Sequence, residues 1–143
     1  EIQPVAVVDA TADAHIAKAM DIPEGTTGTQ TTRLRLRHGE PLLYERFFLP
    51  DALCPNAKRN LESESPASIY LFLEQRYNLL ITRVKERLEA RVATAEECEL
   101  LNLSAGTPVL EAERIAYSLG GAPVEWRIIV GASGRTHYLN EIG

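Results

Sequence analysis

The sequence has few of the residues that build metal centres and catalytic sites. Its 143 residues include two cysteines and three histidines, and Cys54 and Cys98 lack metal-ligand spacing, so we expect two reduced, unpaired thiols. It has no glycine-rich phosphate loop and no recognisable pair of nucleophile and base. The sequence therefore predicts no metal site and no cofactor, and it argues against an enzyme.

Long apolar runs and an excess of positive charge are also absent. No apolar stretch approaches the roughly 20 residues that a membrane-spanning helix needs, and no signal peptide is present, so we expect a cytoplasmic protein without membrane contact. The formal net charge is −5, whereas nucleic-acid-binding modules usually present a basic face. Any contact with DNA is therefore expected from a segment upstream of Glu1, which is not a methionine.

The stretch from Thr31 to Pro50 predicts a β-hairpin with a charged face. Arg33, Arg35 and Arg37 alternate with mostly apolar residues, which is the period of a strand. The segment 38–41, His-Gly-Glu-Pro, predicts a turn because glycine admits positive φ and proline cannot donate to a following ladder. Three guanidinium groups are therefore expected on one face.

Glu45 follows on the returning strand with the parity of residues that favour burial. A buried carboxylate is unfavourable unless it is paired. With a three-residue loop its neighbour is Arg35, and with two or four residues it is Leu34, so the sequence leaves the register open.

A second copy of this pattern predicts two similar halves. Residues 114–126 repeat the order strand, arginine, glycine turn, proline, glutamate and strand, and the lead-in 98–107 parallels 17–26. Both returning strands carry a glutamate of the same parity, Glu45 and Glu125. We therefore expect two pseudo-repeated helix-hairpin halves with equivalent glutamates around a shared pocket.

The remaining segments predict helices between antiparallel strands in one domain, residues 1–143, so the expected fold class is α+β with an antiparallel sheet and flanking helices. On the long strand 79–92, Arg83 is early enough to reach a pocket, while the other charges are expected in solvent.

The expected elements are a strand over 3–8, a helix over 12–20 capped by Thr11, a short helix within 53–60, a helix from Ser65-Pro66 to Tyr77, the strand 79–92, a helix opening at the capping box 94–97, a hairpin over 108–119 and 122–130, and a final strand within 135–142.

Taken in order, these motifs resemble the UTRA domain over nearly the whole chain. That domain is the effector-binding half of the HutC branch of GntR-type bacterial transcription regulators, and its fold is shared with chorismate lyase. Each motif is weak alone, and the order carries the resemblance. The matching motifs are Thr32-Arg33-Leu34-Arg35, Gly39-Glu40-Pro41, Glu45, Leu49-Pro50, Ser68-Ile69-Tyr70, the capping-box helix, Gly106-Thr107-Pro108-Val109-Leu110, Arg114 and Pro123-Val124-Glu125.

The resemblance implies a usually dimeric sensor whose upstream winged helix-turn-helix domain binds operator DNA. In sugar-phosphate-sensing members, the arginines and the serine that match here hold the anionic group, which suits the planar fork of guanidinium and the free amides of a helix start. The expected effector is a small anion: a sugar phosphate, phosphonate or carboxylate. The predicted effector-binding residues are Arg33, Arg35, Glu45, Ser68, Tyr70, Arg83, Glu125 and Tyr138.

The sequence departs from the family after the second hairpin. Family members often carry an aromatic-Arg-Gly-Asp-Arg-Tyr run there, whereas residues 130–138 lack that aromatic residue and the aspartate. Arg135, Thr136, His137 and Tyr138 are expected to form a different end of the pocket.

Structural roles compete with these assignments. The two arginines would form ordinary ion pairs on a solvated face, Glu45 would be a structural partner to one of them, and Ser68 would do no more than cap a helix.

Three functions also compete. The first is an allosteric sensor, in which an effector shifts the population of two dimer arrangements. The second is a chorismate-lyase-like enzyme that holds a carboxylate substrate with the arginine pair. The third is a dimerisation or scaffolding module. The sequence favours the sensor, which an upstream winged helix-turn-helix would confirm.

Overall fold

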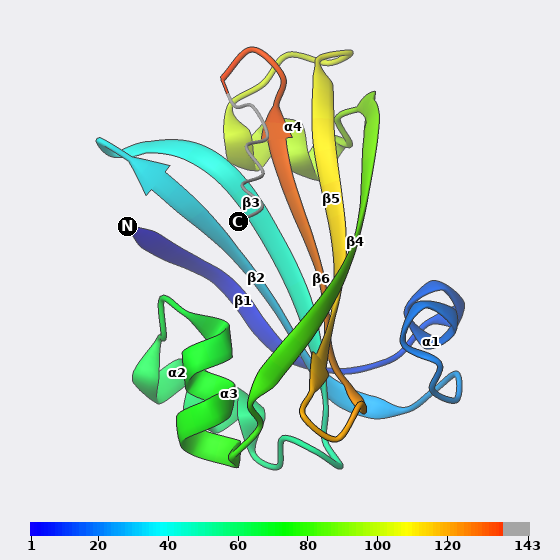
Figure 1. The fold of residues 1–143 in the computed structure, drawn as a ribbon. Helices are drawn as coiled ribbons and strands as arrows, with labels where there is room; N and C mark the ends of the chain where they lie inside the picture. The colour runs from blue at the N-terminus through cyan, green and yellow to red at the C-terminus, as the bar shows by residue number, and fades with distance from the viewer. Residues whose placement is uncertain (136–143) are drawn as a thin grey trace, which may run out of the picture.

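The computed structural model describes residues 1–135, in which six strands form one antiparallel sheet (Figure 1). Their order is β1-β2-β3-β6-β5-β4, so the two hairpins meet at the centre, where β3 pairs with β6. This arrangement confirms the α+β class with an antiparallel sheet. The strands are β1 (Ile2–Thr11), β2 (Thr27–Arg37), β3 (Glu40–Pro50), β4 (Ile81–Val92), β5 (Pro108–Ser118) and β6 (Pro123–Ala132).

Helices cover both faces of the sheet. One face, here called the tryptophan face, packs Trp126 and Phe48 against α1 (Ala14–Met20) and the end of α4 (Ala95–Leu101). The other face, here called the glutamate face, bears Glu45, Glu125 and Phe47; its core includes α2 and α3. Helices α2 and α3 lie together beneath one end of the sheet (Figure 1). They comprise Ala57–Glu64 and Ile69–Tyr77, respectively.

The predicted pseudo-repeat is confirmed by its lead-in segments. Asp21 and Asn102 end α1 and α4 in the left-handed conformation, each with φ of 56°. Gly25 and Gly106 then turn the chain into β2 and β5, each with φ of 86°. Positive φ is unfavourable for most L-residues, which is why the same residue types stand at these places in both halves.

Two helix starts differ from the prediction. Thr11 pairs with Thr27 as the last residue of β1, and Asp13 caps α1 instead, its carboxylate accepting from the Ile16 amide at 2.8 Å. Ser65 ends α2 with φ of 43°, and α3 begins after Ser68. A proline is common just after a helix C-cap as well as at a helix start, so the Ser-Pro pair fitted both readings.

The short helix expected within 53–60 is also shifted, to 57–64. In contrast, the capping box is confirmed: the Thr94 hydroxyl accepts from the Glu97 amide at 3.2 Å, and the Glu97 carboxylate accepts from the Thr94 amide at 3.0 Å. Most of the final strand expected within 135–142 lies outside the described residues.

The first hairpin has a register that differs from both predicted alternatives. Its turn comprises residues 38–39, with φ of 52° and 79°, and a bulge adds one residue to β3 just after it. Glu45 therefore lies opposite Arg33, rather than opposite Arg35 or Leu34. A bulge shifts the pairing of every later residue, and the turn residues alone do not reveal it.

The two glutamates share a face, but they do not occupy equivalent places as predicted. In the first hairpin, Glu45 lies opposite Arg33. Arg114 takes the place of Arg33 in the second hairpin, and the residue opposite it is Arg127. Glu125 lies earlier on β6. The pseudo-twofold arrangement therefore relates a glutamate to an arginine, and it brings acids and bases together at the sheet centre.

Candidate functional site

A buried ion-pair cluster occupies the glutamate face of β2 and β3. Arg33 and Glu45 are 4% and 1% exposed, and Arg33 Nε donates to Glu45 Oε2 at 2.7 Å. Arg35 Nε donates to the other oxygen, Oε1, also at 2.7 Å. Burial alone would raise the pKa of Glu45, but the charge of Arg33 and the hydrogen bond from Arg35 outweigh it, so its pKa is lowered. Glu45 is therefore a paired carboxylate.

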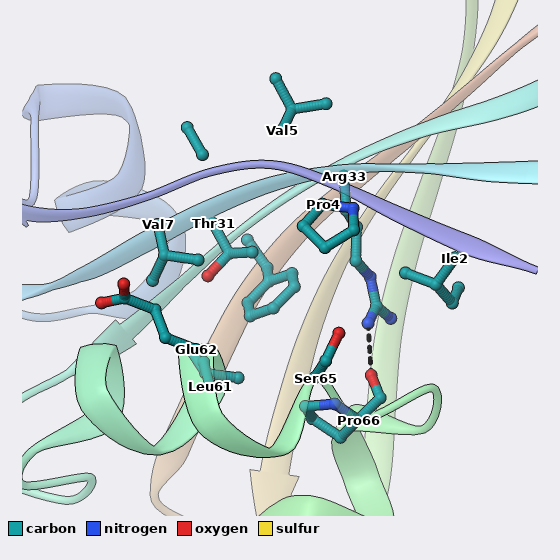
Figure 2. Close-up of a pocket in the computed structure, with 12 residues that line it drawn as sticks. Ile2, Pro4, Val5, Val7, Thr31, Arg33, Leu61, Glu62, Ser65 and Pro66 are labelled. Atoms are coloured by element: carbon teal, nitrogen blue, oxygen red, sulfur yellow. Dashed lines mark hydrogen bonds between the residues drawn. The ribbon is translucent and has the colours of Figure 1, made fainter.

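The same two arginines hold the segment that precedes α3. Arg33 Nη1 and Nη2 donate to the carbonyl oxygens of Pro66 and Ala67, at 2.6 and 3.1 Å, and Figure 2 shows the first of these bonds. Arg35 Nη2 donates to the Ala67 carbonyl at 3.1 Å. Ser68 follows at once and caps α3, its hydroxyl accepting from the Leu71 amide at 3.2 Å. The arginines thus connect the sheet to the start of α3.

Glu125 has a different environment, although it lies on the same face. It is fully buried, and its Oε2 accepts from Nε and Nη2 of Arg127 at 3.1 and 2.8 Å. Its Oε1 is buried and has no hydrogen-bond partner among the described residues. Burial raises the pKa of Glu125, and the negative charge of Glu45 adds to the increase, against the opposing effect of Arg127. This position suits either a protonated carboxyl group or a carboxylate that receives a hydrogen bond from a ligand.

Tyr70 connects α3 to this second acid. Its ring centroid lies 5.2 Å from the guanidinium carbon of Arg127. Its hydroxyl is buried without a hydrogen bond of ordinary geometry to a described residue, although Arg114 is close enough to lower its pKa. Burial and the nearby Glu125 outweigh that effect, so the pKa of Tyr70 is raised. Among the described residues, this part of the cluster therefore holds two buried polar atoms, Glu125 Oε1 and the Tyr70 hydroxyl, that lack a hydrogen bond of ordinary geometry.

Arg127 was not predicted as a site residue. It is 5% exposed, and its guanidinium carbon lies 5.5 Å from the ring centroid of Phe47, while that of Arg33 lies 5.4 Å from the same ring. A signal was present, because Glu125 and Arg127 are two residues apart and so share one face of a strand. Side-chain parity would have added Arg127 to the set.

One predicted residue among those described, Arg83, does not belong to the cluster. Arg83 lies opposite Tyr117 on the tryptophan face, with its guanidinium carbon 3.9 Å from that ring centroid. The prediction placed it by its distance along the strand, but strand parity turned it to the other side of the sheet. Tyr138 lies outside the described residues.

Residues 1–135 offer neither a metal-binding cluster nor a membrane-spanning helix. Within that range no three His, Cys, Asp or Glu side chains are grouped in a way that would hold a metal ion, and no helix has the length and apolar character needed to cross a membrane. Cys54 and Cys98 are both unpaired, as predicted. Burial raises the pKa of the Cys54 thiol to about 12, so this thiol is unreactive at neutral pH.

This α+β domain has the fold of a ligand-binding domain of a GntR-family transcription regulator. It superposes on the ligand-binding domain of a GntR-family regulator from Bordetella bronchiseptica with a TM-score of 0.90 and 26% identity, over 100% of this chain and 90% of that one. The chain belongs to the UTRA domain family, whose model matches residues 4–136. UTRA domains of GntR-family regulators bind effectors.

Sequence relatives agree with this family. The chain is 32% identical over 114 residues to the transcriptional repressor NagR of Bacillus subtilis, covering 78% of this chain. It is 28% identical over 119 residues to the transcriptional regulator PhnF of Escherichia coli, covering 82% of this chain. The match spans about half the length of each, 46% and 48%. The C-terminal domain of the histidine utilization repressor from Pseudomonas syringae shares the fold, with a TM-score of 0.85 and 23% identity.

Proposed function

We propose that this chain is the effector-sensing and dimerisation domain of a cytoplasmic bacterial transcription regulator. A separate upstream winged helix-turn-helix domain would bind operator DNA, which agrees with the acidic charge of this chain and with relatives of which the match spans about half. The relatives named above are transcriptional regulators, so we propose no enzymatic activity and no cofactor. The effector changes operator affinity by favouring one of two dimer arrangements.

The contact of Arg33 and Arg35 with the segment before α3 carries this proposal. In this structure, guanidinium groups that suit a phosphate, phosphonate or carboxylate donate to two neutral carbonyl oxygens. A guanidinium group can bind a phosphate or carboxylate through two parallel N–H···O bonds to an ionised partner, which a single carbonyl oxygen does not offer. An anion would therefore displace the carbonyl oxygens of Pro66 and Ala67 and release the start of α3.

The rest of the effector would meet the second acid. Glu125 Oε1 and the Tyr70 hydroxyl are buried atoms without ordinary hydrogen bonds to the described part of the chain, which suits them to the hydroxyl or amine groups of a ligand. Ser68, whose hydroxyl caps α3, would face the anionic group once the segment before it moved. The proposed effector is thus a small anion with a polar, neutral or amine-bearing body.

A ligand screen tests the proposal. Phosphorylated sugars, phosphonates, amino acids and aromatic acids are compared by thermal shift, since a ligand at about 100 times its Kd adds roughly 2.7 kcal/mol of stability. Arg35→Ala should abolish the shift that the best anion produces, while the exposed Arg59→Ala should not. A screen without any stabilising anion, or an equal response in both variants, would contradict the anion site.

A further inference from the structure

An open groove of about 530 Å³ lies on the tryptophan face, between α1 and the strands β4 and β5. Its walls carry Lys18 of α1 and Lys85 and Arg87 of β4, and Ala19 and Ile115 add apolar surface. The ion-pair cluster of the proposed effector site belongs to the glutamate face, on the other side of the sheet. The groove is therefore separate from that site.

The two carboxylates that line the groove already have partners. Glu113 Oε2 accepts a hydrogen bond from Trp126 Nε1 at 2.8 Å and is also hydrogen-bonded to His15 Nε2. Glu86 forms an ion pair with Arg114. Both acids are thus engaged by groups other than the lysines of the groove.

Those two lysines have no such partner. Within residues 1–135, neither lysine side chain makes an ion pair or a hydrogen bond, whereas Lys58, the third lysine of the sequence, pairs with Glu62 at 2.8 Å. The side chain of Arg87 is 66% exposed, and its contacts with Glu89 and Glu113 are long, at 3.9 and 3.8 Å. The groove therefore keeps an excess of accessible positive charge.

The position of the cations favours an anion as the occupant. Edge strands often carry charged side chains that discourage aggregation, which would explain Lys85 alone. Lys18 belongs to a different element, α1, and yet lines the same groove. Cations that converge from two elements repel one another, and a cleft lined by one sign of charge concentrates counter-ions. An anion between the walls would relieve that repulsion.

The size and chemistry of the groove narrow the class of anion. Its volume lies in the range of small-molecule sites. A lysine ammonium group is a compact point charge that binds phosphate oxygens without the planar geometry that guanidinium groups impose. Because cations stand on both walls, two linked phosphate groups would each meet one lysine. Ala19 and Ile115 would contact an organic group attached to them.

We propose that this groove is a second anion site, which takes a small molecule with two linked phosphate groups. One phosphate lies beside Lys18, and the other lies beside Lys85 and Arg87. The inference does not depend on the proposed effector site, because the two sites share no residue and lie on opposite faces of the sheet.

Inorganic pyrophosphate is the probe, and its binding is followed by titration into the isotopically labelled chain, with amide shifts as the readout. Saturable shifts are expected in α1 and β4. Lys18→Gln and Lys85→Gln should each weaken pyrophosphate binding about fivefold, near the upper end for one exposed ion pair. Lys58→Gln is the matched control and should leave the affinity unchanged, because Lys58 lies on α2 and does not line the groove.

Other ligands test the class of anion. At equal ionic strength, orthophosphate should bind about fivefold more weakly than pyrophosphate, because it meets the cations of only one wall. A short DNA duplex that shifts the same amides and binds more tightly than pyrophosphate would assign the groove to nucleic acid and overturn the proposal. Equal affinities for orthophosphate and pyrophosphate would also overturn it.

The remaining outcomes concern the position of the site. Shifts that do not saturate, shifts confined to elements other than α1 and β4, or equal affinities in Lys58→Gln and Lys85→Gln would each contradict the proposal. The shifts in α1 and β4 should persist in Arg35→Ala, and their loss would show that the two sites are not separate. A failed effector screen would leave all of these expectations unchanged.

Discussion

The two hairpins share one backbone plan and differ in how they neutralise their acids. In the first, Glu45 receives one guanidinium on each oxygen, and its pKa is lowered against the effect of burial. In the second, Glu125 has Arg127 on one oxygen and, within residues 1–135, no partner on the other, and its pKa is raised by burial. The difference arises from the facing strand, because Arg33 lies opposite Glu45 whereas Ala116 lies opposite Glu125.

This difference divides the cluster into two parts. The structural part is Glu45 with Arg33 and Arg35, and the proposed ligand-binding part is Glu125 with Tyr70. A carboxylate with both oxygens paired is already satisfied and contributes rigidity, whereas an acid with an unpaired buried oxygen gains most from an added donor. The structural alternative considered for Glu45 therefore agrees with its contacts. The ligand role remains our prediction for Glu125.

Removing the charge of Glu45 should have the largest effect. Glu45→Gln leaves Arg33 buried without its charged partner, so the free energy of unfolding should fall by about 3 kcal/mol. Urea unfolding measures the loss. Glu64→Gln, in an exposed ion pair with Arg76, is the control and should change stability by less than about 0.5 kcal/mol. Equal losses in the two variants would show that burial does not distinguish the pairs.

The same substitution at Glu125 should act on the ligand instead. Glu125→Gln keeps the shape of the side chain, and the raised pKa of Glu125 already favours its neutral form. The unfolding free energy of the ligand-free protein should therefore change little. Affinity for the best anion of the screen should fall by about 1.5 kcal/mol, or roughly tenfold. Calorimetry decides the matter: unchanged affinity together with a large loss of stability would assign Glu125 to the structural part.

The pH dependence of stability should separate the two acids by sign. The lowered pKa of Glu45 gives stability that is present above its ordinary value near 4.5 and is lost as the pH falls further. The raised pKa of Glu125 gives stability that is full below that value and is lost as the pH rises through the folded pKa.

Urea unfolding from pH 4 to pH 8 measures these dependences. As the pH rises through this range, wild type should lose stability relative to Glu125→Gln. The advantage of wild type over Glu45→Gln should not decrease. Parallel curves for both variants would contradict the assigned directions.

The smallest effect is expected at Tyr70. Tyr70→Phe removes a buried hydroxyl without an ordinary partner and keeps the ring beside Arg127, so unfolding free energy should stay within about 0.5 kcal/mol of wild type. Affinity for the anion should fall by about 1 kcal/mol. A clear loss of stability would show that the hydroxyl is bonded in solution, which would move Tyr70 to the structural part.

Local patterns predicted the order and type of the elements, although the starts of α1, α2 and α3 differ from the prediction. Alternation predicted both hairpins, Thr94 and Glu97 predicted a helix start, and the matching lead-ins predicted two similar halves, because each of these features depends on residues close in sequence. The shared order of motifs was enough to suggest the family that the comparisons confirm. It also selected Arg33, Arg35, Glu45, Tyr70 and Glu125, which the structure places on or against one face.

Only the tertiary structure decided which charges meet. A bulge set Glu45 against Arg33, and the pairing of β4 with β5 placed Arg83 beside Tyr117 on the tryptophan face. The carbonyl oxygens of Pro66 and Ala67 entered the site because α3 begins later than its proline suggested. Register and partner choice depend on contacts between segments far apart in the chain, and a single sequence does not specify them locally.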